Sequence, residues 1–302
     1  MFTRFEENYS GLGLERYALQ HDEIPLIAVS AYLMMVFCLP TILSRWGLDA
    51  TIAKSRALQR CIRGWNLLLA IFSSIGAVKV VPFLVEKLYT EGWRYTVCQE
   101  PTDGFYLNGS VGFWISLFVL SKFPELLDTL FLVLQGKPVI FLHWFHHATV
   151  LLYAWHSCRT RASTGLWFAS MNYCVHSVMY LYFFLMTFSK APALRRSLRR
   201  YGHWITYSQI AQMVMGLIVS VSAGFYRELS SQSCVVAVAN YRMAVGMYTS
   251  YFVLFSFLLA KRLSSSTQKS MTSNGGTCPP NETEICQSTG TRPLMDARRR
   301  QW

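Results

Sequence analysis

Charged residues are scarce in this chain of 302 residues: they make up 15% of it, against 52% for hydrophobic residues. Ordinary soluble domains carry about 25% charged residues. The shortage argues against a soluble globular protein. Runs of about 18 or more apolar residues are long enough to cross a bilayer, and the sequence contains several. It therefore predicts an integral membrane protein.

Other features are missing as well. The eight cysteines include no CxxC pair, so a zinc module is not indicated. Residues 1–23 contain no apolar stretch of the kind found in cleavable signal peptides. Acidic residues are few, which leaves a net charge of +12. Because the basic residues lie between apolar runs, we expect membrane lipid or a phosphate-bearing substrate as partner, and no nucleic acid.

Seven apolar segments are present, and each must be helical to satisfy its backbone within a bilayer. They are Ile24–Ser44, Trp65–Leu84, Val111–Leu134, Pro138–Trp155, Trp167–Phe188, Trp204–Ala223 and Val235–Ala260. Since three residues separate the third and fourth, these two should form a tight hairpin, with the fourth helix beginning near Pro138. The prediction is thus an all-α membrane protein: an N-terminal segment 1–23, a seven-helix domain 24–262 and a disordered tail 263–302.

Basic residues gather in alternate connections between these spans. In the first, fifth and C-terminal connections they are Arg45, Lys54, Arg56, Arg60, Arg63, Lys190, Arg195, Arg196, Arg199, Arg200, Lys261 and Arg262. With seven spans these connections share one side, which the positive-inside rule makes cytosolic. We therefore expect a lumenal N-terminus and a cytosolic C-terminus. Arg159 and Arg161, on the opposite side, do not follow the rule.

Cysteines and glycosylation sequons test this orientation. Cys98 and Cys234 both fall in lumenal connections, where disulfides persist, and we predict that they pair. Asn8 and Asn108 begin lumenal sequons and are predicted to carry glycans. The sequon at Asn281 would be cytosolic and unmodified.

Polar residues inside the predicted spans mark a candidate site, because they are costly in hydrocarbon. On the third span, Lys122, Glu125, Asp128 and Thr129 recur at helical spacing and share one face. This cluster could line a cavity, or it could be an ion-pair network that holds helices together.

Histidines form the second cluster. His143, His146 and His147 converge on one face of the fourth helix. A metal site, acid–base or nucleophilic catalysis by imidazole, and hydrogen-bonded structural histidines are the three interpretations.

Polar stripes continue on the next two helices. Asn172, His176 and Tyr180 lie at i, i+4 and i+8 on the fifth span. On the sixth, Thr206, Gln209 and Gln212 follow at three-residue spacing, where interhelical hydrogen bonding is an alternative explanation. Four helices with one polar face each indicate a bundle around a polar chamber.

Two other functional classes compete with acyl-transfer chemistry. Diiron membrane oxidoreductases need about eight histidines, and this chain has seven, of which four suit as ligands; a single-metal lipid oxidoreductase stays open. A lipid or acyl-CoA transporter also stays open, although we find no internal repeat or broken helix pair.

The four clusters together resemble the signatures of the very-long-chain fatty acid elongases. They appear here as KxxELxDT over Lys122–Thr129, HxxHH over His143–His147, NxxxHxxMY over Asn172–Tyr180 and TxxQxxQ over Thr206–Gln212. The sequence around His143–His147 is similar to the branch that extends saturated and monounsaturated chains. Phe183 departs from the pattern, since many relatives have a second Tyr after Tyr182.

The resemblance implies six of the seven helices in a barrel around a substrate tunnel, in the endoplasmic reticulum membrane. It implies condensation of long-chain acyl-CoA with malonyl-CoA to 3-ketoacyl-CoA, CoA and CO₂, without metal or organic cofactor. Thr129, Tyr180, Gln209 and Gln212 would line the tunnel. A ketoreductase, a dehydratase and an enoyl reductase would be partners. The oligomeric state stays open, a homodimer included.

A mechanism follows as a hypothesis. His146 attacks the acyl thioester to give an acyl-imidazole, and the malonyl-derived enolate then attacks the acyl carbon. By family analogy, His176 is the second catalytic imidazole, positioned by Asn172. His143 and His147 would orient the box and assist proton transfer, and Glu125 and Asp128 could hold the histidine tautomers or keep one imidazole protonated to stabilise enolate charge. Which of His143, His146, His147 and His176 is the nucleophile stays open. The candidate contacts to the CoA phosphates are Lys122, Arg199, Arg200, Lys261 and Arg262.

Overall fold

The computed structural model describes residues 4–102, 105–188, 192–230 and 234–273, and the regular structure in these ranges is helical. Lys190, Asn281 and the predicted tail beyond residue 273 lie outside them. By contacts the chain divides into two units, Met1–Ser256 and Phe257–Trp302. The second unit contains the last part of helix α12, and the first contains the other helices.

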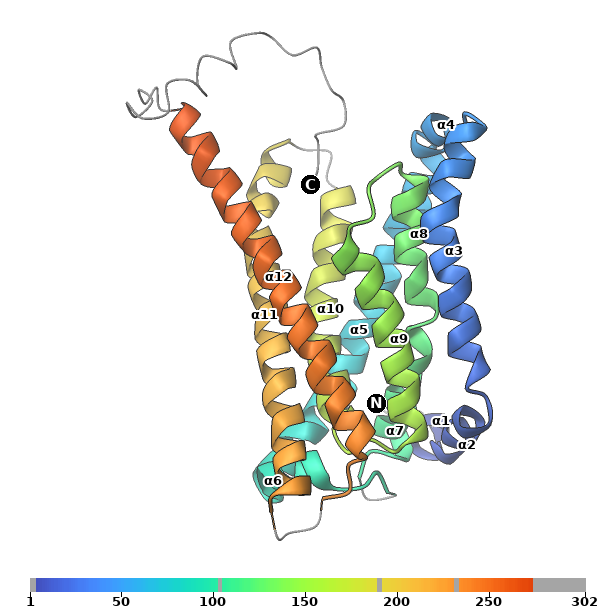
Figure 1. Cartoon of the computed structure of the whole chain (residues 1–302), viewed down its shortest axis with the longest axis vertical. Helices are drawn as coiled ribbons and strands as arrows, with labels where there is room; N and C mark the ends of the chain where they lie inside the picture. Colours follow the sequence, from blue (N-terminus) through green and yellow to red (C-terminus); the bar gives the residue numbers. More distant parts are fainter. Residues whose placement is uncertain (1–3, 103–104, 189–191, 231–233, 274–302) are drawn as a thin grey trace. The chain divides into compact units, whose positions relative to one another are not determined.

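The chain contains both long and short helices (Figure 1). The long helices are α3 (Glu23–Arg45), α5 (Arg56–Thr90), α9 (Phe141–Arg159), α10 (Gly165–Phe188), α11 (Pro192–Glu228) and α12 (Val238–Ser273). The shorter ones are α1 (Arg4–Glu7), α2 (Leu12–Gln20), α4 (Asp49–Ala53), α6 (Gly92–Cys98), α7 (Gly109–Ser121) and α8 (Leu127–Leu134), with a 3₁₀ turn over Pro124–Leu126.

Four described helices are long and apolar enough to cross a membrane: α3, α5, α11 and the Val238–Ser264 part of α12. The other three predicted spans are also helical. One is divided into α7, the 3₁₀ turn and α8, while α9 and α10 carry the polar clusters, which lower their apolar character. The described part of the chain is therefore an all-α, multi-pass membrane protein.

Two predicted boundaries are wrong. Helix α9 begins at Phe141 and not near Pro138. Gly136 has a φ of 65° and ends α8 in a left-handed turn, and a residue that precedes proline avoids the helical region. At the other end, α12 continues to Ser273, so the predicted disordered tail begins as helix.

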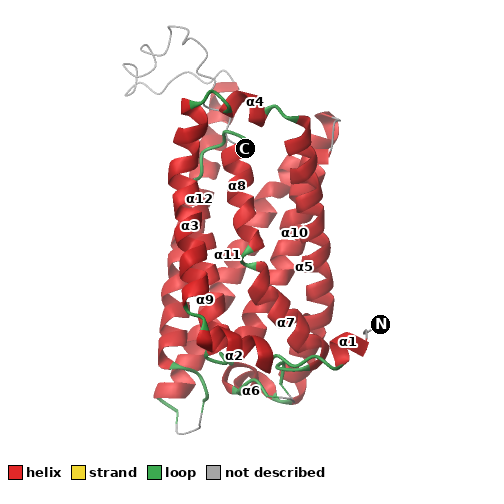
Figure 2. Ribbon diagram, turned by 90° about the vertical axis from the view of Figure 1, so that its right-hand side faces the viewer, coloured by secondary structure: helices red, strands yellow, loops and turns green. Residues whose placement is uncertain are grey.

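Close helix packing depends on small residues that face large ones. Helix α10 lies along α5 (Figure 2). A Cβ atom at Gly76 of α5 would come within 2.4 Å of the Tyr173 ring of α10. Gly216 of α11 leaves room in the same way for Tyr248 of α12. These glycines let the backbones approach closely.

Further contacts show which other helices are neighbours. Helix α10 also packs on α11, and α3 packs on α8 and α9. Helix α7 contacts α5, α9 and α10. Helix α12 reaches α9 through Tyr251 and Thr149, whose hydroxyl oxygens lie 2.5 Å apart. All helices that carry predicted site residues are thus linked.

The N-terminal segment and two connections meet at one end of the bundle, where Figure 2 shows α1, α2 and α6. The amide of Gly11 donates to the carbonyl of Leu107 at 3.1 Å. Cys98 and Cys234 form a disulfide, which is the predicted pairing. The two residues from connections expected to share one side of the membrane are therefore in contact.

Acids at the same end neutralise the two arginines that oppose the positive-inside pattern. Arg159 pairs with Asp22. The Nε atom of Arg161 lies 2.7 Å from Oε1 of Glu15, and its Nη1 lies 3.3 Å from Oε1 of Glu100. A paired arginine adds little net charge, which explains why these residues can depart from the rule.

Candidate functional site

Lys122 and Glu125 of the KxxELxDT segment form a buried ion pair at the junction between α7 and the 3₁₀ turn. Lys122 is 2% exposed and Glu125 is 4% exposed. Nζ of Lys122 lies 2.7 Å from Oε1 of Glu125, which also accepts a hydrogen bond from Ser121 at 2.8 Å. Lys122 was expected to contact CoA, but its buried position inside this network does not suit that role.

The ion pair continues onto α10. Lys122 donates to Oδ1 of Asn172 at 3.1 Å, and Nδ2 of Asn172 lies 3.0 Å from Nε2 of His176. Glu125 was expected to hold a histidine tautomer directly. Its hydrogen bonds go to Lys122 and Ser121, and it is linked to His176 through the side chains of Lys122 and Asn172.

A second network surrounds Asp128. Its two carboxylate oxygens each accept a hydrogen bond at 2.6 Å, one from the indole of Trp65 and one from the hydroxyl of Tyr180. The Tyr180 ring contacts the His176 ring, with centroids 5.3 Å apart. Tyr180 therefore contacts both Asp128 and His176. Trp65 was not predicted, because nothing in its own segment distinguishes it from a membrane-interface tryptophan.

Thr129, which follows Asp128 in the sequence, links helix α3 to this network. The hydroxyl oxygens of Thr129 and Tyr32 lie 2.8 Å apart, and both residues are buried. Thr129 was predicted to line a tunnel, and here it forms a contact between α8 and α3.

Histidines of α9 face this polar cluster. The ring centroids of His143 and His147 are 4.6 Å apart, and those of His146 and His147 are 5.6 Å apart. Helix α7 contacts both α9 and α10. The structure thus brings the three signature segments of α7–α8, α9 and α10 together.

Several imidazole nitrogens in this cluster are buried and have no hydrogen-bond partner among the residues that the structure describes. They are Nε2 of His143, Nδ1 of His146 and Nδ1 of His147. Buried polar atoms are normally satisfied. Unpaired ones suit groups that bind or react with a ligand. Within the described ranges, no three His, Cys, Asp or Glu side chains are placed to share a metal ion.

Tyr251 of α12 packs against His146, and the sequence did not predict this contact. Its ring lies 4.7 Å from the His146 ring, centroid to centroid, and its hydroxyl lies 3.3 Å from the carbonyl oxygen of His146. Tyr251 is 1% exposed. Its position in an aromatic-rich apolar segment resembles that of an ordinary core residue, so no sequence signal could have found it.

The TxxQxxQ segment, Thr206–Gln212, lies on α11. Gln212 is buried, and Nε2 of Gln209 donates to the Met179 sulfur of α10 at 3.5 Å. Thr206 bonds the carbonyl oxygen of Gly202 in its own helix. The hydrogen bond of Gln209 joins this segment to α10.

The expected CoA-binding cations lie outside the buried network. Arg199 and Arg200 are exposed on the first turns of α11. Lys261 is exposed and Arg262 is half-buried on the part of α12 that belongs to the second unit.

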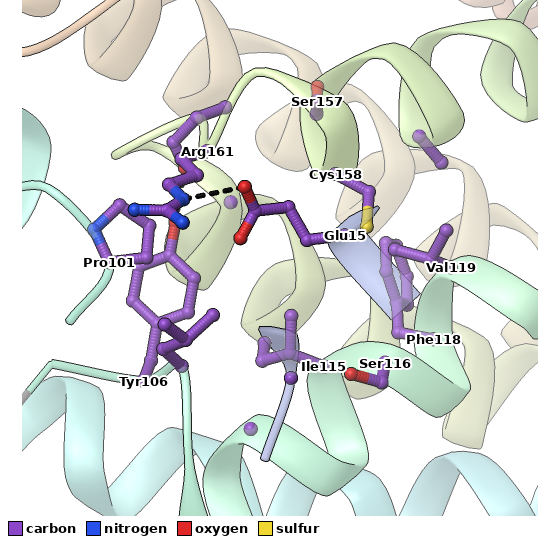
Figure 3. A pocket seen from close by; sticks show the side chains of 16 residues that line it. Glu15, Pro101, Tyr106, Ile115, Ser116, Phe118, Val119, Ser157, Cys158 and Arg161 are labelled. Atoms are coloured by element: carbon purple, nitrogen blue, oxygen red, sulfur yellow. Dashed lines mark hydrogen bonds and ion pairs between the residues drawn. The ribbon is translucent and has the colours of Figure 1, made fainter. Parts of the chain in front are cut away.

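A small cavity of about 70 Å³ lies near the end that carries the disulfide (Figure 3). Glu15 and Arg161 form an ion pair on one side of it. Phe118 and Val119 of α7 line the other side. Phe118 also carries Nζ of Lys122 over its ring, 4.3 Å from the centroid. Phe118 therefore borders both the cavity and the ion pair of Lys122 and Glu125.

These features define an all-α membrane protein with a buried ion pair, two buried imidazoles, His147 and His176, and two half-buried ones, His143 and His146. Comparison with known proteins identifies its family. The family model described as ELO, the GNS1/SUR4 family, matches residues 17–271, and the chain belongs to this family.

Named relatives agree. Fatty acid elongase 3 of Trypanosoma brucei brucei is 37% identical over 289 residues, which cover 89% of this chain and 93% of the relative. Fatty acid elongase 3 of Trypanosoma cruzi is 38% identical over 278 residues, 85% of this chain and 89% of the relative. Very long chain fatty acid elongase 6 of Drosophila melanogaster is 44% identical over 194 residues, 64% of this chain and 59% of the relative. The resemblance drawn from the four motifs is confirmed.

Proposed function

We propose that this chain takes part in fatty acid elongation as the condensing enzyme, joining long-chain acyl-CoA to malonyl-CoA. Family membership and the names of the relatives support the pathway. The observation that carries the chemistry is a cluster of three imidazoles on α9, His143, His146 and His147, with His176 on α10, where both helices contact α7.

The proposed reaction has two stages. A ring nitrogen of His146 attacks the thioester carbonyl carbon, the carbon–sulfur bond breaks, and CoA leaves with a proton. Malonyl-CoA then loses CO₂, and the resulting enolate carbon attacks the acyl-imidazole. The carbon–nitrogen bond breaks, and the leaving ring nitrogen takes up a proton to restore the neutral imidazole. The product is a 3-ketoacyl-CoA two carbons longer than the acyl substrate.

Burial supports this order of events, because an acyl-imidazole is readily lost to water. Lys122 and Glu125 are almost fully buried, His147 and His176 are buried, and His146 is half-buried. A closed site excludes competing hydrolysis and strengthens electrostatic interactions with developing charge. The route requires no metal or organic cofactor.

The proposed membrane arrangement has seven spans, with α7, the 3₁₀ turn and α8 together forming one of them. Six spans would form a barrel around a tunnel, with the outer helix α3 against it. We propose the endoplasmic reticulum membrane, with the N-terminus in the lumen and the C-terminus in the cytosol. Arg199, Arg200, Lys261 and Arg262 would then bind the CoA phosphates at the cytosolic mouth.

The product indicates the partners. A 3-ketoacyl-CoA must be reduced, dehydrated and reduced again before the next round, so we propose a ketoreductase, a dehydratase and an enoyl reductase as functional partners. A homodimer is compatible with this scheme.

Incorporation of radiolabelled malonyl-CoA by purified protein, measured across acyl-CoA lengths, tests the function. The expected result is a labelled 3-ketoacyl-CoA, lost in His146→Ala and kept in His21→Ala. His21 is a matched control, since it lies outside the cluster and pairs with Glu23. A folded wild-type protein that gives no product with any chain length contradicts the proposal.

Glycan mapping tests the orientation. Asn8 is exposed, whereas Oδ1 of Asn108 accepts a hydrogen bond from the amide of Gly11 at 3.2 Å. We therefore expect the glycan on Asn8, removed by Asn8→Gln and little affected by Asn108→Gln. A glycan on Asn281 would reverse the proposed orientation.

A further inference from the structure

All the hydrogens of the Lys122 ammonium face a defined partner. Nζ lies 2.7 Å from Oε1 of Glu125 and 3.1 Å from Oδ1 of Asn172, and it lies over the ring of Phe118. A carboxylate, an amide oxygen and an aromatic face are the three kinds of group that attract an ammonium. Lys122 is thus held in one place and acts only as a donor.

Because Lys122 can only donate hydrogen bonds, it fixes the orientation of the Asn172 side-chain amide. The amide has one accepting end and one donating end, and the accepting oxygen must face Lys122. The opposite orientation would place the Asn172 NH₂ group against the ammonium and leave a buried donor unpaired. Nδ2 of Asn172 therefore points to Nε2 of His176, 3.0 Å away.

We infer that Lys122, acting through Asn172, holds His176 as the tautomer with its proton on Nδ1. An NH₂ group can only donate, so Nε2 of His176 must accept and cannot carry a hydrogen. The neutral ring then has its single N–H at Nδ1. Lys122 and Asn172 are positioning residues, and Glu125 and Ser121 hold Lys122 in turn.

The mechanistic consequence rests on the proposed condensation. The lone pair of Nε2 is already engaged with Asn172, and Nδ1 carries the proton, so His176 has no nitrogen available to attack a thioester. His176 is therefore not the nucleophile. Its Nδ1–H is a hydrogen-bond donor, suited to an oxygen on which negative charge develops. The acyl group should form its covalent bond with the α9 histidines instead.

The tautomer can be measured without any enzyme activity. The full chain is produced with ¹⁵N-labelled histidine and placed in lipid nanodiscs, and solid-state NMR distinguishes protonated from unprotonated ring nitrogens. The His176 signals are identified by their absence in His176→Gln. We expect an unprotonated Nε2 and a protonated Nδ1. The opposite assignment in the wild-type protein overturns the inference, whether or not the chain is an elongase.

Two variants test the hydrogen bonds that run from Lys122 through Asn172 to His176. Asn172→Leu removes the donor to Nε2, and we expect His176 to show both tautomers. The double variant Lys122→Met with Glu125→Leu frees the amide without leaving a buried charge unpaired, and should have the same effect. Asn66→Leu is the matched control, because buried Asn66 bonds only the Ile62 carbonyl of its own helix. Unchanged His176 signals in folded Asn172→Leu protein would exclude Asn172 as the positioning residue.

Covalent trapping tests the consequence. Intact mass analysis of protein quenched after mixing with acyl-CoA alone should detect the acyl adduct in His176→Gln and not in His146→Ala. For Asn172→Leu we expect kcat to fall about 10- to 100-fold with little change in KM. An adduct that maps to His176 overturns the inference. Absence of an adduct in every active protein contradicts the proposed acyl-imidazole route and leaves the NMR result unaffected.

Discussion

Tyr251 of α12 and His146 of α9 are in direct contact, although 105 residues separate them. The imidazole lies against the tyrosine ring, and the tyrosine hydroxyl reaches the His146 carbonyl oxygen and the Thr149 hydroxyl. The ring restricts the rotamer of His146, and the hydroxyl holds the helix turn that carries it. Tyr251 is therefore expected to set the direction of the proposed nucleophile.

The Tyr251 contact predicts unequal effects of two substitutions. Tyr251→Phe keeps the ring and should retain most of the activity. Tyr251→Leu removes the ring, and a misplaced imidazole should lower kcat about 100-fold. Steady-state rates of malonyl-CoA incorporation provide the measurement. Tyr248→Leu is the control, because Tyr248 is equally buried on α12 but contacts Phe168. Equal losses of kcat in Tyr248→Leu and Tyr251→Leu would argue against a specific role.

The cavity beside Phe118 predicts a change in product length. If the acyl tail extends from the histidines past Phe118, its end enters this space, which Ser116 also lines. Ser116→Leu should fill the cavity and shift the products toward shorter chains, whereas Ser116→Ala should leave them unchanged. Chromatography of the products formed from a series of acyl-CoA lengths measures the shift. An unaltered product range in folded Ser116→Leu protein would place the tail elsewhere.

A salt bridge predicts how stability depends on pH. Lys79 of α5 donates to Glu6 of α1 at 2.7 Å, and Ser110 donates at 2.9 Å. The bond from Lys79, against some opposition from burial, holds the pKa of Glu6 below its ordinary 4.5. The stabilisation, about 2 kcal/mol, is present above that ordinary value. It is lost as the pH falls through the lower pKa of the folded state.

Melting temperatures between pH 7 and pH 3 give the test. The wild-type protein should lose more stability in acid than Glu6→Gln, which lacks the charge at every pH. Glu7→Gln serves as the control, since Glu7 is exposed and adjacent in sequence. Parallel pH curves for the wild-type protein and Glu6→Gln would show that this salt bridge does not contribute.

The disulfide between Cys98 and Cys234 joins residues 136 positions apart. Closing so long a loop should stabilise the fold by about 4–5 kcal/mol by restricting the unfolded chain. The double variant Cys98→Ala, Cys234→Ala should therefore melt about 10 °C lower. Cys61→Ala, at an exposed free thiol, is the control. A double variant that melts like the wild-type protein in non-reducing conditions would contradict this expectation.

Much of the architecture could be read from the sequence, because a bilayer leaves an apolar chain few choices. Seven apolar segments predict seven helices, and helices cover each of them. The spacing of His143, His146 and His147 placed them on one face, and periodicity alone is enough for that. The disulfide partners followed from the side of the membrane to which their connections were assigned.

Only the tertiary structure decided which polar groups meet across helices. Helix periodicity gives a residue its face but not its partner, so the pairing of Lys122 with Asn172, or of Asp128 with Trp65, was not predictable. Hydrogen bonds between residues 50 or more positions apart depend on how the helices pack. The positions of glycines such as Gly76 control that packing. The sequence by itself determined the helices and the chemical groups they carry, and the packing of one helix against another determined which of those groups can act together.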